Sequence, residues 1–160
     1  MIAYVDGGSR GSPGPAGIGV VVEHPTGRRV EISQSIGARD NNYAEYAALL
    51  AALEHAVAYQ SPCLQVYSDS EVVVRQISGA YNCQSPGLRD IYSACMALIG
   101  TFQYFAITHI RRENNADADR LAKEAIDRAT REKQPVNDRP SEDYLLLVNP
   151  RKLLPIEQAG

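Results

Sequence analysis

The chain has 160 residues, of which 44% are hydrophobic and 22% are charged, and its formal net charge is −3. These values are typical of one folded domain and exclude disordered, collagen-like and disulfide-rich proteins. Taken alone, the negative charge argues against nucleic-acid binding, although most of the 16 basic residues are arginines, whose guanidinium groups match phosphate well.

The first part of the chain shows three strand patterns. Residues 2–5 form a short apolar run that ends at Asp6, and residues 17–23 are predicted to form a second strand. Residues 29–36 are predicted to form a third strand, in which apolar residues alternate with polar ones. A segment rich in glycine and proline, residues 7–17, is predicted to be a tight or flexible loop between the first two strands. Three strands joined by short turns are typical of an antiparallel meander.

The remainder of the chain alternates helices and strands. The hydrophobic period changes over residues 42–59, which predicts a long and largely apolar helix. Further elements are expected as a strand over 64–68, helices over 70–77 and 88–99, a strand over 102–110 and a helix over 117–131. This order predicts an α/β fold, in which helices flank a mixed five-stranded sheet of three antiparallel strands followed by two parallel ones.

The last residues differ in character. Pro135 and Pro140 break the helical pattern, and polar stretches surround one apolar cluster, residues 144–148. We therefore expect a catalytic domain over residues 1–133 and a tail, residues 134–160, that docks on it as an extra strand or extended segment.

Cysteine usage and hydropathy bear on the cellular setting. The three cysteines have no C-x-x-C spacing, which is typical of reduced thiols in a cytosolic protein. No apolar run approaches the roughly 18–20 residues of a membrane span. The first residues include Asp6 and no basic region, which is unlike a signal peptide. We expect a cytoplasmic protein that makes no membrane contact.

Acidic residues stand where an α/β sheet places its functional sites. Asp6 and Asp69 each end a short apolar strand, and carboxylates at neighbouring strand ends repel unless a cation lies between them. Glu45 begins the first long helix, and Asp117 and Asp119 begin the last, so short loops could bring them to the same edge. Because no cysteine or histidine set accompanies them, these oxygen ligands favour Mg²⁺ or Mn²⁺ over zinc.

Each acid also has a purely structural alternative. Asp69 could cap the helix that follows it, and the spacings Asn42-x-x-Glu45 and Ser68-x-x-Glu71 fit capping arrangements. Their joint occurrence at two strand ends and two helix starts favours a metal-dependent protein.

Four motifs carry a resemblance to a known family. They are Y-V-D-G-G-S-R-G-S-P-G-P-A-G-I-G (4–19), N-N-Y-A-E (41–45), Y-S-D-S (67–70) and R-E-N-N-A-D-A-D-R-L-A (112–122). In this order and spacing they resemble the type 1 ribonuclease H family over residues 1 to 133. Residues 80–87 are too short for the basic handle of longer members, so the chain resembles the short form.

The resemblance implies a ribonuclease H fold and a metal-dependent endonuclease, a hydrolase that cuts the RNA strand of RNA–DNA hybrids and leaves 5′-phosphate and 3′-hydroxyl ends. It implies two ions, Mg²⁺ or Mn²⁺, and four residues that are both catalytic and metal-binding: Asp6, Glu45, Asp69 and Asp119. It also implies substrate contacts from the backbone amides of Gly7, Gly8 and Ser9 and from the side chains of Asn41, Asn42 and Gln76. We expect a monomer whose partner is the hybrid.

Some features depart from the family pattern. Asp40 stands where many members carry threonine, so a phosphate contact there is not expected. The catalytic-loop histidine of longer members has no match, and His109 is not assigned to it. The alternatives are a ribonuclease H-fold module that binds nucleic acid or a protein without cutting, and a related nuclease that acts on double-stranded RNA or DNA. The presence of all four acids favours the hybrid nuclease.

The choice between Asp117 and Asp119 as the fourth ligand rests on helix geometry. Residues two apart on a helix point roughly 200° away from each other, so both cannot serve one metal. Asp119 lies beside the apolar stripe of Leu121 and Ala122, which should face the sheet. We therefore predict Asp119 as the ligand, and the family pattern places its acid there as well.

Overall fold

The five predicted strands form one mixed sheet. The computed structural model describes residues 1–83 and 85–131. The strands are β1 (Ile2–Ser9), β2 (Gly14–Glu23), β3 (Arg29–Arg39), β4 (Cys63–Ser68) and β5 (Tyr104–His109), in the spatial order β3-β2-β1-β4-β5. The first three pair antiparallel, whereas β4 runs parallel to both β1 and β5. The predicted fold class is therefore confirmed.

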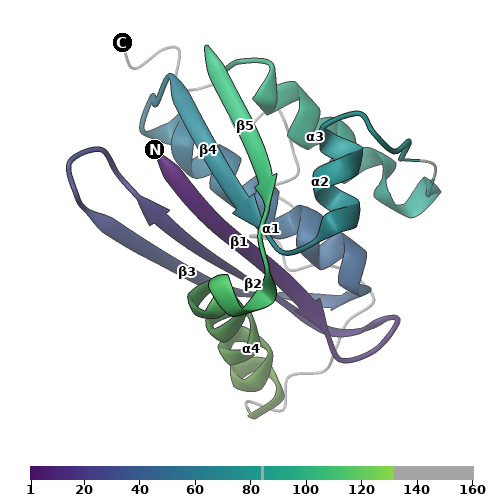
Figure 1. The fold of residues 1–160 in the computed structure, drawn as a ribbon. Coiled ribbons are helices and arrows are strands. Elements are labelled where there is room, and N and C mark those ends of the chain that lie inside the picture. Colours follow the sequence, from purple (N-terminus) through teal and green to yellow (C-terminus); the bar gives the residue numbers. More distant parts are fainter. Residues whose placement is uncertain (84, 132–160) are drawn as a thin grey trace.

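The helices cover both faces of this sheet. They are α1 (Asn41–Ala58), α2 (Glu71–Ile77), α3 (Arg89–Ile99) and α4 (Ala116–Arg131), with short 3₁₀ turns η1 (Pro86–Leu88) and η2 (Arg112–Asn114). α1 packs on β1 and β2, with α3 against it, while α4 lies on the other face across β2 and β3 (Figure 1). Within the described part of the chain, no helix combines the length and hydropathy that a membrane crossing requires.

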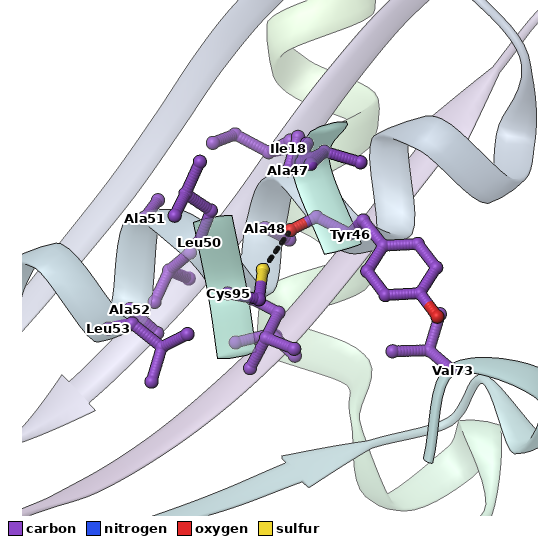
Figure 2. Packing of buried hydrophobic residues seen from close by; sticks show 14 of the residues in the cluster. Ile18, Tyr46, Ala47, Ala48, Leu50, Ala51, Ala52, Leu53, Val73 and Cys95 are labelled. Atoms are coloured by element: carbon purple, nitrogen blue, oxygen red, sulfur yellow. Dashed lines mark hydrogen bonds between the residues drawn. The ribbon is translucent and has the colours of Figure 1, made fainter. Parts of the chain in front are cut away.

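The main hydrophobic core lies between α1, the sheet and α3. Ile18 of β2 and Leu50 and Leu53 of α1 are fully buried in it, as Figure 2 shows. Cys95 of α3 is also buried, and its thiol donates to the backbone oxygen of Tyr46 at 3.8 Å (Figure 2). Since α1 is enclosed by the sheet on one side and α3 on the other, it is apolar around most of its circumference. All three cysteines are free thiols.

The segment predicted as a loop over residues 7–17 is mostly strand, and only residues 10–13 connect β1 to β2. Glycine normally weakens a strand, but here its missing side chain admits helices on both faces. A Cβ on Gly7 would lie 2.1 Å from the backbone oxygen of Ala44 in α1, and one on Gly19 would lie 2.0 Å from that of Ala118 in α4. Gly7 and Gly19 therefore mark close helix–sheet contacts rather than a loop.

The predicted tail, residues 134–160, lies outside the described residues. Its docking and the domain boundary at residue 133 stay predictions.

Candidate active site

Three of the four predicted acids meet at one edge of the sheet. One carboxylate oxygen from each of Asp6, Glu45 and Asp69 lies within 4.8 Å of the other two. Asp6 and Asp69 are neighbours because β1 and β4 run parallel and their ladder ends with the Val5–Ser68 pair, one residue before each acid. The two strand-end acids therefore emerge side by side, as parallel strands require.

Glu45 reaches this edge because α1 packs directly on β1. Successive residues of a strand point to opposite faces, so Gly7 faces α1 while Asp6 faces the α4 side. A Cβ on Gly7 would lie 2.6 Å from the backbone nitrogen of Glu45. The backbone N–H of Gly7 lies near the Glu45 carboxylate and favours its ionised form, which partly offsets the rise in its pKa. The glycine after Asp6 thus brings the second acid within reach of the first.

Neither Glu45 nor Asp69 serves as a helix cap. Asp40 caps α1 by accepting from the backbone N–H of Tyr43 at 2.8 Å, and Ser70 caps α2. Both capping spacings considered from the sequence are therefore wrong, because each helix is capped by a neighbouring residue. The carboxylate of Asp40 is thus engaged with the start of α1.

The electrostatics of the cluster favour a cation. Only 6% of Asp6 and 5% of Glu45 is exposed. Burial, together with the nearby charge of Asp69, raises the pKa of Asp6 to about 7. Burial and the adjacent Asp6 raise the pKa of Glu45 well above its usual range. Within residues 1–83 and 85–131, the buried Oε2 of Glu45 has no hydrogen-bond partner. Clustered oxygen donors with one unsatisfied buried oxygen fit Mg²⁺ or Mn²⁺.

Asp117 and Asp119, the two acids at the start of α4, lie in different surroundings. Asp119 lies close enough to Asp6 to share a hydrogen bond when one of them is protonated. It also pairs with Lys123 at 2.8 Å. Partial burial opposes ionisation of Asp119, but Lys123 and Asp6 lower its pKa overall. Asp117 instead pairs with Arg29 at 2.9 Å, where more than half of its side chain is exposed. The geometry favours Asp119 beside the cluster, and its role as a ligand stays a prediction.

The predicted substrate-binding residues lie on two parts of the molecule, β1 together with the start of α1, and α2. Gly8 lies beside Asn41, since a Cβ on Gly8 would be 3.9 Å from the Asn41 Oδ1. Asn42 is exposed at the start of α1. Gln76 lies on α2, where its Oε1 accepts from the Tyr46 hydroxyl. The substrate contacts of these residues stay predictions.

The amides of the glycine segment have different partners. The bond from the Arg10 N–H to the Pro15 oxygen sets the alternation of the β1–β2 ladder, so the Gly8 amide faces β2. The Gly7 amide lies near the Glu45 carboxylate. The amide of Ser9 faces away from β2 by the same alternation. Its hydroxyl donates to the backbone oxygen of Arg39 at 2.6 Å.

One residue at this site was not anticipated from the sequence. Asn115 lies directly before α4 and is 2% exposed, and its Nδ2 donates to the backbone oxygen of Val5 at 2.9 Å. An asparagine immediately before a helix is an ordinary capping signal, so the sequence alone does not indicate that Asn115 contacts β1.

The part of the chain that carries these acids is similar to known proteins. Residues 4–125 match the family model described as reverse transcriptase-like. Ribonuclease HI of Halobacterium salinarum is 42% identical over 128 residues, which cover 79% of this chain and 64% of that protein. The bifunctional protein Rv2228c of Mycobacterium tuberculosis is 41% identical over 132 residues, which cover 81% of this chain and 36% of that protein. The chain thus spans less than two thirds of both relatives.

The fold of this chain matches solved structures over nearly the whole length of those structures. The crystal structure of RNase H1 from Halobacterium salinarum has a TM-score of 0.75 at 42% identity and covers 80% of this chain and 98% of that one. LC11-RNase H1 in complex with an RNA/DNA hybrid has a TM-score of 0.75 at 41% identity and covers 81% of this chain and 98% of that one.

Proposed function

Because the chain belongs to the type 1 ribonuclease H family, we propose that it cleaves the RNA strand of RNA–DNA hybrids. The observation that carries the proposal is the group of Asp6, Glu45 and Asp69, whose oxygens lie within 4.8 Å of one another at the edge of the sheet. A relative of similar length has been crystallised with such a hybrid. We propose further that the protein acts as a monomer in the cytoplasm.

Four carboxylates would hold two divalent ions, Mg²⁺ or Mn²⁺: Asp6, Glu45, Asp69 and Asp119. When bound, the ions would activate the attacking water and stabilise the leaving 3′ oxygen, which gives 5′-phosphate and 3′-hydroxyl products. Because burial raises the pKa values of Asp6 and Glu45, a proton competes with a cation for these two acids. Lys123 keeps Asp119 ionised beside them.

Recognition of RNA would come from groups next to these acids. The 2′-hydroxyl, which can both donate and accept a hydrogen bond, distinguishes RNA from DNA. Asn41 lies beside Gly8, so an amide side chain and strand backbone are available within two residues of Asp6 on β1. Because the Gly7 amide lies near the Glu45 carboxylate, Gly7 would contribute to RNA recognition only indirectly. The Ser9 amide faces away from β2 and could contact the RNA strand.

The experiment compares three labelled duplexes: an RNA–DNA hybrid, double-stranded RNA and double-stranded DNA. Each is incubated with the protein and Mg²⁺, Mn²⁺ or a chelator. We expect cleavage of the hybrid alone, and only with a divalent ion. Binding of the hybrid without cleavage would instead identify a nucleic-acid-binding module, and cutting of double-stranded RNA or DNA would identify a different nuclease.

Asp6→Asn is the matched control. It should abolish cleavage but raise the melting temperature in chelator, because it removes one of the buried carboxylates that repel each other. Full activity of this variant would contradict the proposed mechanism.

A further inference from the structure

One buried amide joins the elements that carry the acids. Asn115 lies between η2 and α4, and its Nδ2 donates to the Val5 oxygen at 2.9 Å and to Asp69 Oδ2 at 3.4 Å. Its backbone oxygen accepts from the N–H of Asp119 at 3.1 Å. Val5 directly precedes Asp6. A single residue therefore touches the strand, the loop and the helix from which three of the acids emerge.

The contacts of the Asn115 side chain are made by its amide nitrogen, Nδ2, which is a hydrogen-bond donor. The β1–β4 ladder ends at the Val5–Ser68 pair, and a buried carbonyl at the end of a ladder needs a donor from elsewhere. Asp69 is also an acceptor when ionised. Both contacts are made by Nδ2, which has two hydrogens, whereas the buried Oδ1 has no hydrogen-bond partner among the residues that the structure describes. An aspartate of the same shape would place a negative charge against two acceptors.

We propose that Asn115 is a positioning residue for the divalent ions, an inference that rests on the proposed function. It fixes the first turn of α4 against the end of β1 and orients the Asp69 carboxylate by a hydrogen bond. Asp119 and Asp69 then face Asp6 from fixed directions. Groups that orient metal-binding side chains affect ion affinity without touching the ion.

The test separates positioning from stability with three variants. Asn115→Ala removes the donor. Asn114→Ala changes the adjacent exposed asparagine. Ser33→Ala removes a 2.6 Å hydrogen bond from β3 to the Leu121 oxygen of α4, at a distance from the acids. Thermal melting, calorimetric titration of the free protein with Mg²⁺, and the Mg²⁺ dependence of hybrid cleavage are measured for each.

We expect Asn115→Ala to weaken Mg²⁺ binding by about 10- to 100-fold, the usual effect of removing a group that orients a metal ligand. The rate at saturating Mg²⁺ should also fall, because the carboxylates are no longer held in place. Asn114→Ala should match the wild type. Ser33→Ala should lower the melting temperature but leave Mg²⁺ affinity unchanged.

Wild-type Mg²⁺ affinity in Asn115→Ala would overturn the proposal and leave Asn115 a structural residue. If Asn115→Ala does not fold, Asn115→Ser, which keeps a shorter donor, should fold and bind Mg²⁺ more weakly than the wild type, and equal affinity would again overturn it. The calorimetric titration uses no nucleic acid. A wild type that binds Mg²⁺ but cuts no hybrid would therefore contradict the proposed function while still deciding the role of Asn115.

Discussion

Arg29 of β3 holds Asp117 of α4 in an ion pair of 2.9 Å on the outer side of the helix. Hydrogen bonding to Arg29 lowers the pKa of Asp117. Residues two apart on a helix point about 200° away from each other, so Asp119 lies on the other side of α4, where it faces Asp6. Asp119 is therefore the acid of α4 that is available to the active site.

Replacing these two acids should have opposite consequences. We expect Asp119→Asn to lower the rate of hybrid cleavage at saturating Mg²⁺ by roughly 10²- to 10³-fold, the scale on which a single electrostatic contact to the transition state acts. Asp117→Asn should change the melting temperature little, because the ion pair is exposed to solvent, and should leave the rate near that of the wild type. Single-turnover rates and thermal melts of both variants check this, and a large loss confined to Asp117→Asn would identify the other acid as the ligand.

Local patterns in the sequence were sufficient for the fold and for three of the acids. Strand ends at Asp6 and Asp69 and the helix start near Glu45 are marked by changes of hydrophobic period, which depend only on neighbouring residues. The register of parallel strands then places the first two side by side. The same patterns did not reveal that Asp40, rather than a residue inside α1, caps that helix.

Features that depend on contacts between distant elements were missed. The sequence pattern places Gly7 in a loop, because glycine has a low strand propensity, and Gly19 in a strand, but it does not show that each lies against a helix far along the chain. Asn115 was missed for the same reason, since its partner Val5 is 110 residues away. Periodicity does not show which helix packs on which strand.

The close contact at Gly19 gives a second prediction. Gly19→Ala would place a Cβ 2.0 Å from the Ala118 oxygen, beside Asp119, so α4 must shift away from β2. We expect a loss of about 1–3 kcal/mol or more in the free energy of unfolding, together with a lower rate of hybrid cleavage. Gly87→Ala is the control, because no atom of the described residues lies within 4 Å of a Cβ there. Chemical denaturation of both variants measures the difference, and equal stabilities would contradict the packing described here.

The tail gives a third prediction, which concerns residues outside those the structure describes. Leu145, Leu146, Leu147 and Val148 are adjacent apolar residues, and leaving them in water costs roughly 25 cal/mol per Å² of apolar surface. If they dock on the domain, truncation after Lys133 should lower the melting temperature by about 2–4 °C for each kcal/mol lost and keep Mg²⁺-dependent cleavage. An unchanged melting temperature would show that the tail does not stabilise the domain.

A buried acid away from the active site gives a pH dependence. Glu54 lies on α1 and is only 8% exposed, and its Oε1 has no hydrogen-bond partner in the described part of the chain. Burial raises the pKa of Glu54 to about 8. It lies near the buried Cys95 thiol of α3, whose pKa is raised by burial and by this carboxylate. Glu54 is therefore protonated in the folded protein at neutral pH.

The consequence is a loss of stability at alkaline pH. Between the ordinary pKa near 4.5 and the folded value of about 8, the folded state holds a proton that the unfolded state has released. Stability therefore falls as pH rises through this range, by an amount on the order of 3–5 kcal/mol.

Glu54→Gln is uncharged at every pH and should remove this contribution. We expect its melting temperature in chelator to exceed that of the wild type by a margin that grows from pH 5 to pH 9. Because the active-site acids titrate equally in both proteins, they cancel from the difference, and a margin that stays constant over this range would show that Glu54 is ionised in the folded protein throughout.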